Sequence, residues 1–148
     1  MIALRHIALL AALVLLPLDA ARAERMVVLV TGASCPLEEI TSLDVRKAYL
    51  GISVSVDGHR LTPIQVVGDE LLSSIFYQSI VSMSRKSYER RALSLTLKYG
   101  TPRAKKVESV ADAAEVVIEH DCGIAYLWKA DADRLPMLKT VRTLWQGE

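Results

Sequence analysis

The sequence has no charge excess of either sign. Its 148 residues carry 18 Lys and Arg against 17 Asp and Glu, a net charge of +1. A nucleic-acid-binding domain needs a clear basic excess, so we expect no nucleic-acid partner. Low-complexity, collagen-like and acidic disordered patterns are absent too, and 51% of the residues are apolar. The length and composition therefore predict one ordinary globular domain.

The sequence also lacks the motifs of metal and catalytic sites. It contains neither a Cys-x-x-Cys nor a His-x-x-x-His spacing, which are common arrangements of metal ligands. We recognise no set of nucleophile, base and orienting group, and no pair of acidic residues in a supported cleft. We therefore expect no metal, no cofactor and no enzymatic activity.

Long apolar runs are missing as well. The run from Ile7 to Leu16 has ten residues, whereas a membrane-spanning helix needs about 20. Arg5 precedes this run, Pro17 ends it, and Ala21-Arg22-Ala23 has the small-x-small pattern of a cleavage site. These features predict a Sec-type signal peptide over residues 1–23, a single mature domain over residues 24–148, and a periplasmic protein without stable membrane insertion. An uncleaved amphipathic anchor is the alternative.

Apolar patterns divide the mature chain into alternating strands and helices. We expect strands at Met26–Val30, Ile52–Val56, Leu61–Val67, Gly123–Trp128 and Leu138–Leu144. We expect helices at Ser42–Leu50, Asp69–Met83, Lys86–Tyr99 and from Ser109 onward. Such alternation predicts an α/β fold with three layers.

Local signals mark several ends of these elements. Thr41 and Ser109 each precede an Asp by three residues, the spacing of a capping box at a helix start. Gly51 lies where a helix ends, and Asp57-Gly58 is the strongest turn signal in the chain. These helix ends and this turn are expected in any tertiary arrangement, because each depends only on residues a few positions away.

Charge is distributed unevenly along the chain. Residues 85–106 contain eight basic residues against Glu89 alone, a local charge of +7, whereas residues 108–121 contain five acidic residues and no basic one. Two helix surfaces that neutralise each other are the simpler interpretation. The alternative is a basic face, between Arg85 and Lys106, for an anionic ligand, lipid headgroups or a partner protein.

The order of these signals resembles a known family. Two segments, Ile40 to Gly51 and Asp57 to Ile64, are similar to segments of the phosphate-binding proteins of ABC importers. Later positions resemble landmarks of small PstS-like substrate-binding domains: Phe76, Tyr88, Gly100-Thr101-Pro102, Ser109 and Gly123-Ile124-Ala125-Tyr126. The resemblance covers nearly all of the mature chain. It implies a mixed α/β/α sheet like one lobe of a type II periplasmic binding protein.

This resemblance also implies functions. The first is an exported solute-binding-type protein that binds a small, phosphate-like anion or assists phosphate uptake by an ABC importer. The alternative is an envelope protein-protein interaction module that has lost the ligand site. In such lobes, ligands lie at helix N-termini that face a cleft. Thr31, Gly32 and Ser34, which lie at the end of the first strand, are therefore candidate ligand-binding residues, although an ordinary strand-to-loop exit is the simpler interpretation of them.

One departure from the family predicts weak or no phosphate affinity. Phosphate binders of this family have two lobes and carry an Arg and a Ser-Gly-Thr loop before the helix that contains the aromatic residue. Here the corresponding stretch, Val66 to Leu72, has neither and carries two carboxylates, Asp69 and Glu70. Both carboxylates would repel phosphate.

Cys35 and Cys122 are expected to form a disulfide. An exported pair of thiols normally becomes oxidised, although two buried free thiols are the alternative. In type II lobes, the strand that corresponds to Gly123–Trp128 runs antiparallel to the parallel core. This arrangement would bring its start, and hence Cys122, beside the end of the first strand and Cys35.

Overall fold

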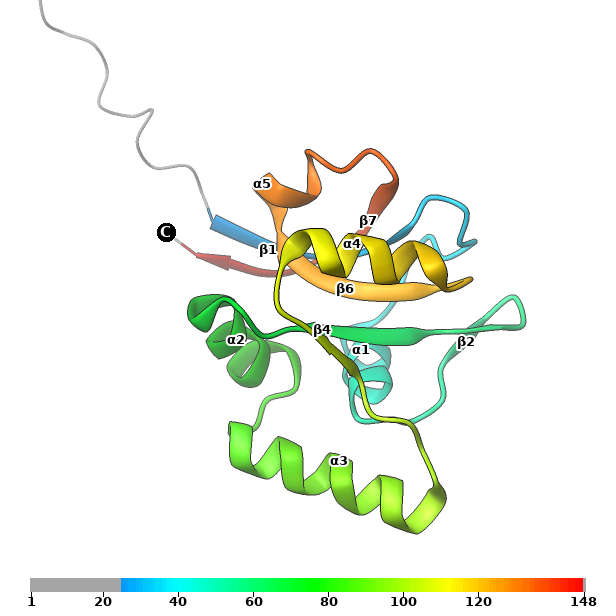
Figure 1. Cartoon of the computed structure of the whole chain (residues 1–148), viewed down its shortest axis with the longest axis vertical. Coiled ribbons are helices and arrows are strands. Elements are labelled where there is room, and N and C mark those ends of the chain that lie inside the picture. Colours follow the sequence, from blue (N-terminus) through cyan, green and yellow to red (C-terminus); the bar gives the residue numbers. More distant parts are fainter. Residues whose placement is uncertain (1–24, 148) are drawn as a thin grey trace, which may run out of the picture.

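The computed structural model describes residues 25–147, and Figure 1 shows them as a central sheet with helices around it. The predicted signal peptide, residues 1–23, lies outside the described residues and stays a prediction. The strands are β1 (Arg25–Gly32), β2 (Ser55–Val56), β3 (His59–Arg60), β4 (Thr62–Val66), β5 (Lys105–Val107), β6 (Gly123–Trp128) and β7 (Leu138–Gly147). The helices are α1 (Ser42–Tyr49), α2 (Glu70–Ile75), the π-helix η2 (Phe76–Ile80), α3 (Arg85–Tyr99), α4 (Val110–Glu119) and α5 (Lys129–Ala132).

The main sheet has five strands in the order β5-β4-β6-β1-β7. β4 is parallel to both β5 and β6, whereas β1 is antiparallel to both β6 and β7. The expectation that the Gly123–Trp128 strand runs against the parallel core is therefore wrong, and β1 is the reversed strand. The chain crosses from β5 to β6 through α4. This crossover lets β6 run parallel to β4, because parallel strands need such a connection.

Helices cover both faces of this sheet, which confirms the three-layer α/β fold. α4 and α5 pack against β1 and β6. α1 packs against β4, η2 packs against β7, and these two helices contact each other. Gly123 shows how closely α4 approaches, because a Cβ atom at this position would lie 2.7 Å from the carbonyl oxygen of Val117. On the opposite face of β6, Tyr126 stacks on Phe76 with ring centroids 4.8 Å apart.

A cluster of aromatic side chains fills this second face. Tyr49, Phe76, Tyr88 and Tyr126 pack with ring centroids about 5 Å apart. The Tyr49 hydroxyl donates to the Ile64 carbonyl at 2.9 Å, and the Tyr88 hydroxyl donates to the Tyr49 carbonyl at 2.7 Å. Burial raises the pKa of all three phenols, so their hydroxyls stay protonated and act as hydrogen-bond donors.

The helix starts agree with the local sequence signals. The side chains of Thr41 and Ser109 accept hydrogen bonds from the backbone N–H groups three residues on, both at 3.1 Å. Asp69 and Ser84 cap α2 and α3 in the same way. Each side-chain oxygen satisfies one of the backbone donors that a helix N-terminus leaves unpaired.

Two other expectations need correction, and two short elements were not expected. The single helix expected at Asp69–Met83 is α2 followed by the π-helix η2, and the chain leaves helical structure after Ile80. The strand expected at Ile52–Val56 is reduced to β2, which forms a hairpin with β3 around Asp57 and Gly58, with φ values of +46° and +81°. The short elements β5 and α5 were not expected at all, because three or four residues carry too little periodicity.

The structure contains a disulfide between Cys35 and Cys122, with their Cα atoms 5.2 Å apart. Cys35 follows the end of β1 and Cys122 precedes the start of β6. These two ends meet because Thr31 pairs with Ile124 in the antiparallel register. The bond closes a sequence separation of 87 residues.

Candidate functional site

The carboxyl ends of the parallel strands β4 and β6 meet the start of α2. β4 ends at Val66, β6 ends at Trp128, and Asp69 begins the short helix that follows β4. Ligands of open α/β sheets usually bind outside the carboxyl ends of the strands, near helix N-termini. A ligand site is therefore expected where β4 and β6 end.

The Asp69 carboxylate occupies the N-terminus of α2. Its Oδ1 accepts a hydrogen bond from the Leu72 N–H at 2.9 Å, and its Oδ2 accepts one from the Trp128 indole N–H at 2.8 Å. Partial burial acts to raise the pKa of Asp69, but these two hydrogen bonds and one from the Leu71 N–H outweigh it and lower the pKa. The carboxylate is therefore a stable negative charge at the position where an anion would approach the helix.

A cavity of about 430 Å³ opens beside this pair. Arg25, Lys129, Asp69 and Asp131 contribute two positive and two negative side chains to its lining. The apolar part of the lining consists of Met26, Leu71, Trp128 and Ala130. The volume is within the range of roughly 300–1,000 Å³ that is typical of small-molecule sites. The balance of charges favours neither a free anion nor a free cation.

Neighbouring contacts fix two walls of this cavity. Trp145 packs edge-on against Trp128 with ring centroids 6.3 Å apart, so the indole is held from β7 as well as by Asp69. Lys129 donates to the Asp133 carboxylate at 2.7 Å, and this ion pair engages its ammonium group. The aromatic wall is thus held in place before any ligand arrives.

A second cavity, of about 830 Å³, lies at the other end of the sheet. Its walls come from the start of α1, the β2–β3 hairpin and β7, with Glu39, Asp44 and Arg142 as its charged residues. Arg142 donates to the Ile40 carbonyl at 3.1 Å. The Thr41 side chain caps α1, and Asp44 adds a carboxylate to the first turn. The N-terminus of α1 in this cavity, like that of α2 in the first cavity, is therefore already capped by a side chain of the protein.

The candidate ligand residues Thr31, Gly32 and Ser34 lie far from Asp69. β1 is the reversed strand, so its end lies beside the start of β6. Trp128 lies at the other end of β6. Thr31 is fully buried, and its hydroxyl donates to the Gly123 carbonyl at 2.8 Å. Gly32 ends β1, and Ser34 is exposed in the following turn. Thr31 thus has a structural role, and anion binding by this segment stays a prediction.

Sequence reasoning identified Asp69 as a helix start and as a carboxylate that would repel phosphate, but it did not link Asp69 to Trp128, which it placed only in a strand. The two residues are 59 positions apart, and no local pattern links the end of one strand to the helix that follows another. The apolar run Gly-Ile-Ala-Tyr-Leu-Trp identified the strand but not the direction of its last side chain. The position of this tryptophan at a strand's carboxyl end was the one available signal.

Residues 25–147 contain no group of three His, Cys, Asp or Glu side chains placed to hold a metal ion. Within the same range, no helix has both the length and the apolar character needed to cross a membrane.

Comparisons with known proteins identify the fold. No family model and no curated protein matches the sequence. Among solved structures, the chain is similar to an ABC-type phosphate transport receptor from Vibrio cholerae, with a TM-score of 0.58 and 13% identity over 81% of this chain. It is also similar to PstS from Borrelia burgdorferi, with a TM-score of 0.56 and 12% identity over 80% of this chain.

These similarities show that the chain has an α/β fold like one lobe of a substrate receptor. More particularly, the lobe is like those of PstS-type phosphate receptors. The matched region is 47% of each receptor, so this chain spans about half the length of the proteins that it resembles. At this level of identity the likeness shows the fold, and the ligand has to be argued from the residues of this chain.

Proposed function

We propose that this chain is an exported, non-catalytic binding protein of the solute-binding type, and that the cavity beside Asp69 and Trp128 takes a small neutral or zwitterionic solute. The hydrogen bond between Trp128 and Asp69 is the observation that carries this proposal. It holds an aromatic surface and a carboxylate together on one wall of a cavity of about 430 Å³. The charged side chains of the whole lining, two positive and two negative, sum to zero and match a ligand with no net charge.

Free phosphate does not fit this cavity. Phosphate carries negative charge at neutral pH and needs unpaired N–H donors or basic side chains. Here Asp69 already accepts the Leu72 N–H and the Trp128 indole N–H. Asp131 adds a second carboxylate to the lining, and Lys129 is paired with Asp133. Phosphate at this position would lie against two carboxylates, Asp69 and Asp131, and would have Arg25 as the basic lining residue outside the Lys129–Asp133 pair.

The export part of the proposal rests on the N-terminal sequence and the disulfide. Residues 1–23 have the pattern of a signal peptide, which leaves the domain at residues 24–148. A disulfide between Cys35 and Cys122 is typical of proteins in oxidising compartments such as the periplasm. One of the similar structures is described as a phosphate transport receptor, which supports a binding role.

A thermal-shift screen of the purified protein against neutral, zwitterionic and anionic solutes tests this function. We expect a neutral or zwitterionic compound to raise Tm, since a ligand at a hundredfold excess over its Kd adds about 2.7 kcal/mol of stability. Trp128→Phe keeps an aromatic wall but removes the indole donor, and it should reduce the shift. Glu38→Gln, a surface carboxylate that pairs with Lys139, is the control and should leave the shift unchanged.

The second candidate function is an envelope interaction module that has lost its ligand site. It is favoured by the side-chain caps Thr41, Asp69, Ser84 and Ser109, which occupy the N-termini of α1 to α4. If no solute raises Tm, this candidate replaces the first. If instead an oxyanion binds and Ser34→Ala weakens it, the loop after β1 is the ligand site.

A further inference from the structure

Two helices of this chain present outer faces of opposite charge. The basic face is the outer surface of α3, formed by Lys86, Arg90, Leu93 and Leu97 at helical spacing and flanked by Arg91 and Lys98. The acidic face is the outer surface of α4, formed by Asp112, Glu115, Ile118 and Glu119. All of these side chains are exposed. Each face therefore combines charges of one sign with exposed aliphatic side chains.

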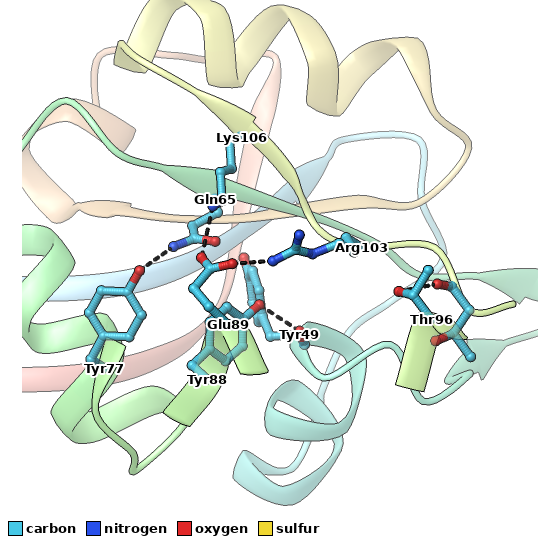
Figure 2. A network of polar contacts seen from close by, with 9 residues as sticks. Tyr49, Gln65, Tyr77, Tyr88, Glu89, Thr96, Arg103 and Lys106 are labelled. Carbon is cyan, nitrogen blue, oxygen red and sulfur yellow. Dashed lines mark hydrogen bonds and ion pairs between the residues drawn. The ribbon is translucent and has the colours of Figure 1, made fainter. Parts of the chain in front are cut away.

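The two faces do not neutralise each other within one chain. Among residues 25–147, no ion pair joins α3 to α4. The basic side chains nearest the α4 carboxylates are Lys105 and Lys106 of β5, which line a shallow hollow with Asp112, Glu115 and Glu119. The one acidic residue of α3, Glu89, pairs with Arg103 and Lys106 (Figure 2), and Arg85 pairs with Glu70. In Figure 1, α3 lies at the bottom of the view, whereas α4 lies above β6, on the far side of β4 from α3.

The inner side of α3 is fixed while its outer side is left open. Tyr88 and Ala92 are the buried residues of this helix, and the Tyr88 hydroxyl donates a hydrogen bond to the Tyr49 carbonyl (Figure 2). By contrast, Leu97 is 78% exposed and Leu93 is 46% exposed. On α4, Ile118 is 53% exposed beside the carboxylates. Both faces are thus on helices that are anchored from beneath, so docking would require little ordering.

We propose that the basic face of α3 docks on the acidic face of α4 in a second copy of this chain. Charge complementarity selects this occupant. The predicted mature chain carries 16 basic and 16 acidic residues, and one copy supplies both halves of the contact. An anionic membrane would satisfy α3 but would leave the acidic face of α4 unmatched. The contact is heterologous, because different surfaces of the two copies meet.

The proposal is independent of the ligand cavity, since neither α3 nor α4 contributes to its lining. The attraction between exposed charges is screened by salt, whereas contacts among leucine and isoleucine side chains are not. Association should therefore be strongest at low ionic strength and weaken as salt is added.

Charge reversal followed by mixing tests the contact. The purified protein would be measured by sedimentation velocity up to about 0.1 mM, in about 0.01 M and about 1 M salt. One variant reverses the basic face (Lys86→Glu with Arg90→Glu), and another reverses the acidic face (Glu115→Lys with Glu119→Lys). Arg60→Glu, an exposed position on β3, is the control, and circular dichroism verifies that every variant is folded.

We expect the wild type and Arg60→Glu to associate at low salt, and each reversed variant alone to sediment as a monomer. An equal mixture of the two reversed variants should associate again, because each reversed face then meets a face of opposite charge. A wild-type monomer at low salt overturns the proposal, as does association that survives either reversal. Binding of a monomeric wild type to anionic vesicles through the basic face would assign that face to lipid instead.

Discussion

The indole N–H of Trp128 donates to the Asp69 carboxylate at 2.8 Å, across a sequence separation of 59 residues. The contact ties the end of β6 to the start of α2 and places a negative charge at the edge of the sheet where ligands of this fold class are expected. The same carboxylate caps α2 through Leu72. Asp69 therefore caps α2 and, under the proposed function, sets the charge that a ligand of this cavity meets.

Asp69→Ala is expected to destabilise the protein by about 1 kcal/mol or more, because α2 loses its cap and the Trp128 indole loses its acceptor. Asp69→Asn should cost less at neutral pH, since asparagine is an equally good cap. Urea unfolding of the three proteins measures the difference. Equal stability of Asp69→Ala and wild type would show that these two hydrogen bonds contribute nothing.

The lowered pKa of Asp69 also predicts a pH dependence. A carboxylate with a lower pKa in the folded state stabilises the protein above its unfolded pKa, about 3.9. That stability is lost as pH falls from there through the folded pKa. Wild type should therefore lose more stability than Asp69→Asn between about pH 5 and pH 2. Parallel pH curves for the two proteins would contradict this expectation.

Reduction of the Cys35–Cys122 disulfide should destabilise the protein substantially. A cross-link over 87 residues stabilises a fold by about 4 to 5 kcal/mol in the chain-entropy model. Denaturant unfolding with and without reductant measures this difference, and the Cys35→Ala with Cys122→Ala protein should behave like the reduced form. Non-reducing peptide mapping should recover the two cysteines linked, and recovery of both as free thiols would argue against the bridge.

Gly123→Ala should destabilise the protein by about 1–3 kcal/mol, because the new methyl group would overlap the backbone of Val117 in α4. Gly32→Ala is the matched control at the end of β1, where an added Cβ has no atom within 4 Å. Thermal unfolding compares them. A Gly123→Ala protein as stable as Gly32→Ala would mean that α4 does not pack this closely on β6.

Protein recovered from the periplasm should begin at Glu24, because Ala21-Arg22-Ala23 matches a signal-peptidase site. N-terminal sequencing of the exported material measures this directly. Intact Met1 on membrane-bound protein would favour the uncleaved anchor.

The sequence was informative where structure depends on near neighbours. The starts of α1 and α4 followed from Thr41 and Ser109, and the hairpin turn followed from Asp57-Gly58, because each needs only a few adjacent residues. The order of strands and helices also predicted the layered α/β fold.

The sequence was uninformative where the structure depends on contacts between residues far apart in the chain. Nothing local showed that β1, rather than β6, is the reversed strand. The π-helix at Phe76 departs from the α-helical spacing by one residue per hydrogen bond, which the apolar periodicity does not distinguish. The contact between Trp128 and Asp69 required the folded arrangement of β4 and β6.

Titration calorimetry with inorganic phosphate tests the central claim most directly. With the Asp69 carboxylate at the start of α2, we predict no measurable binding of phosphate to the wild type, while the solute that raises Tm binds and loses affinity in Trp128→Phe. Micromolar binding of phosphate to the wild type would contradict the account.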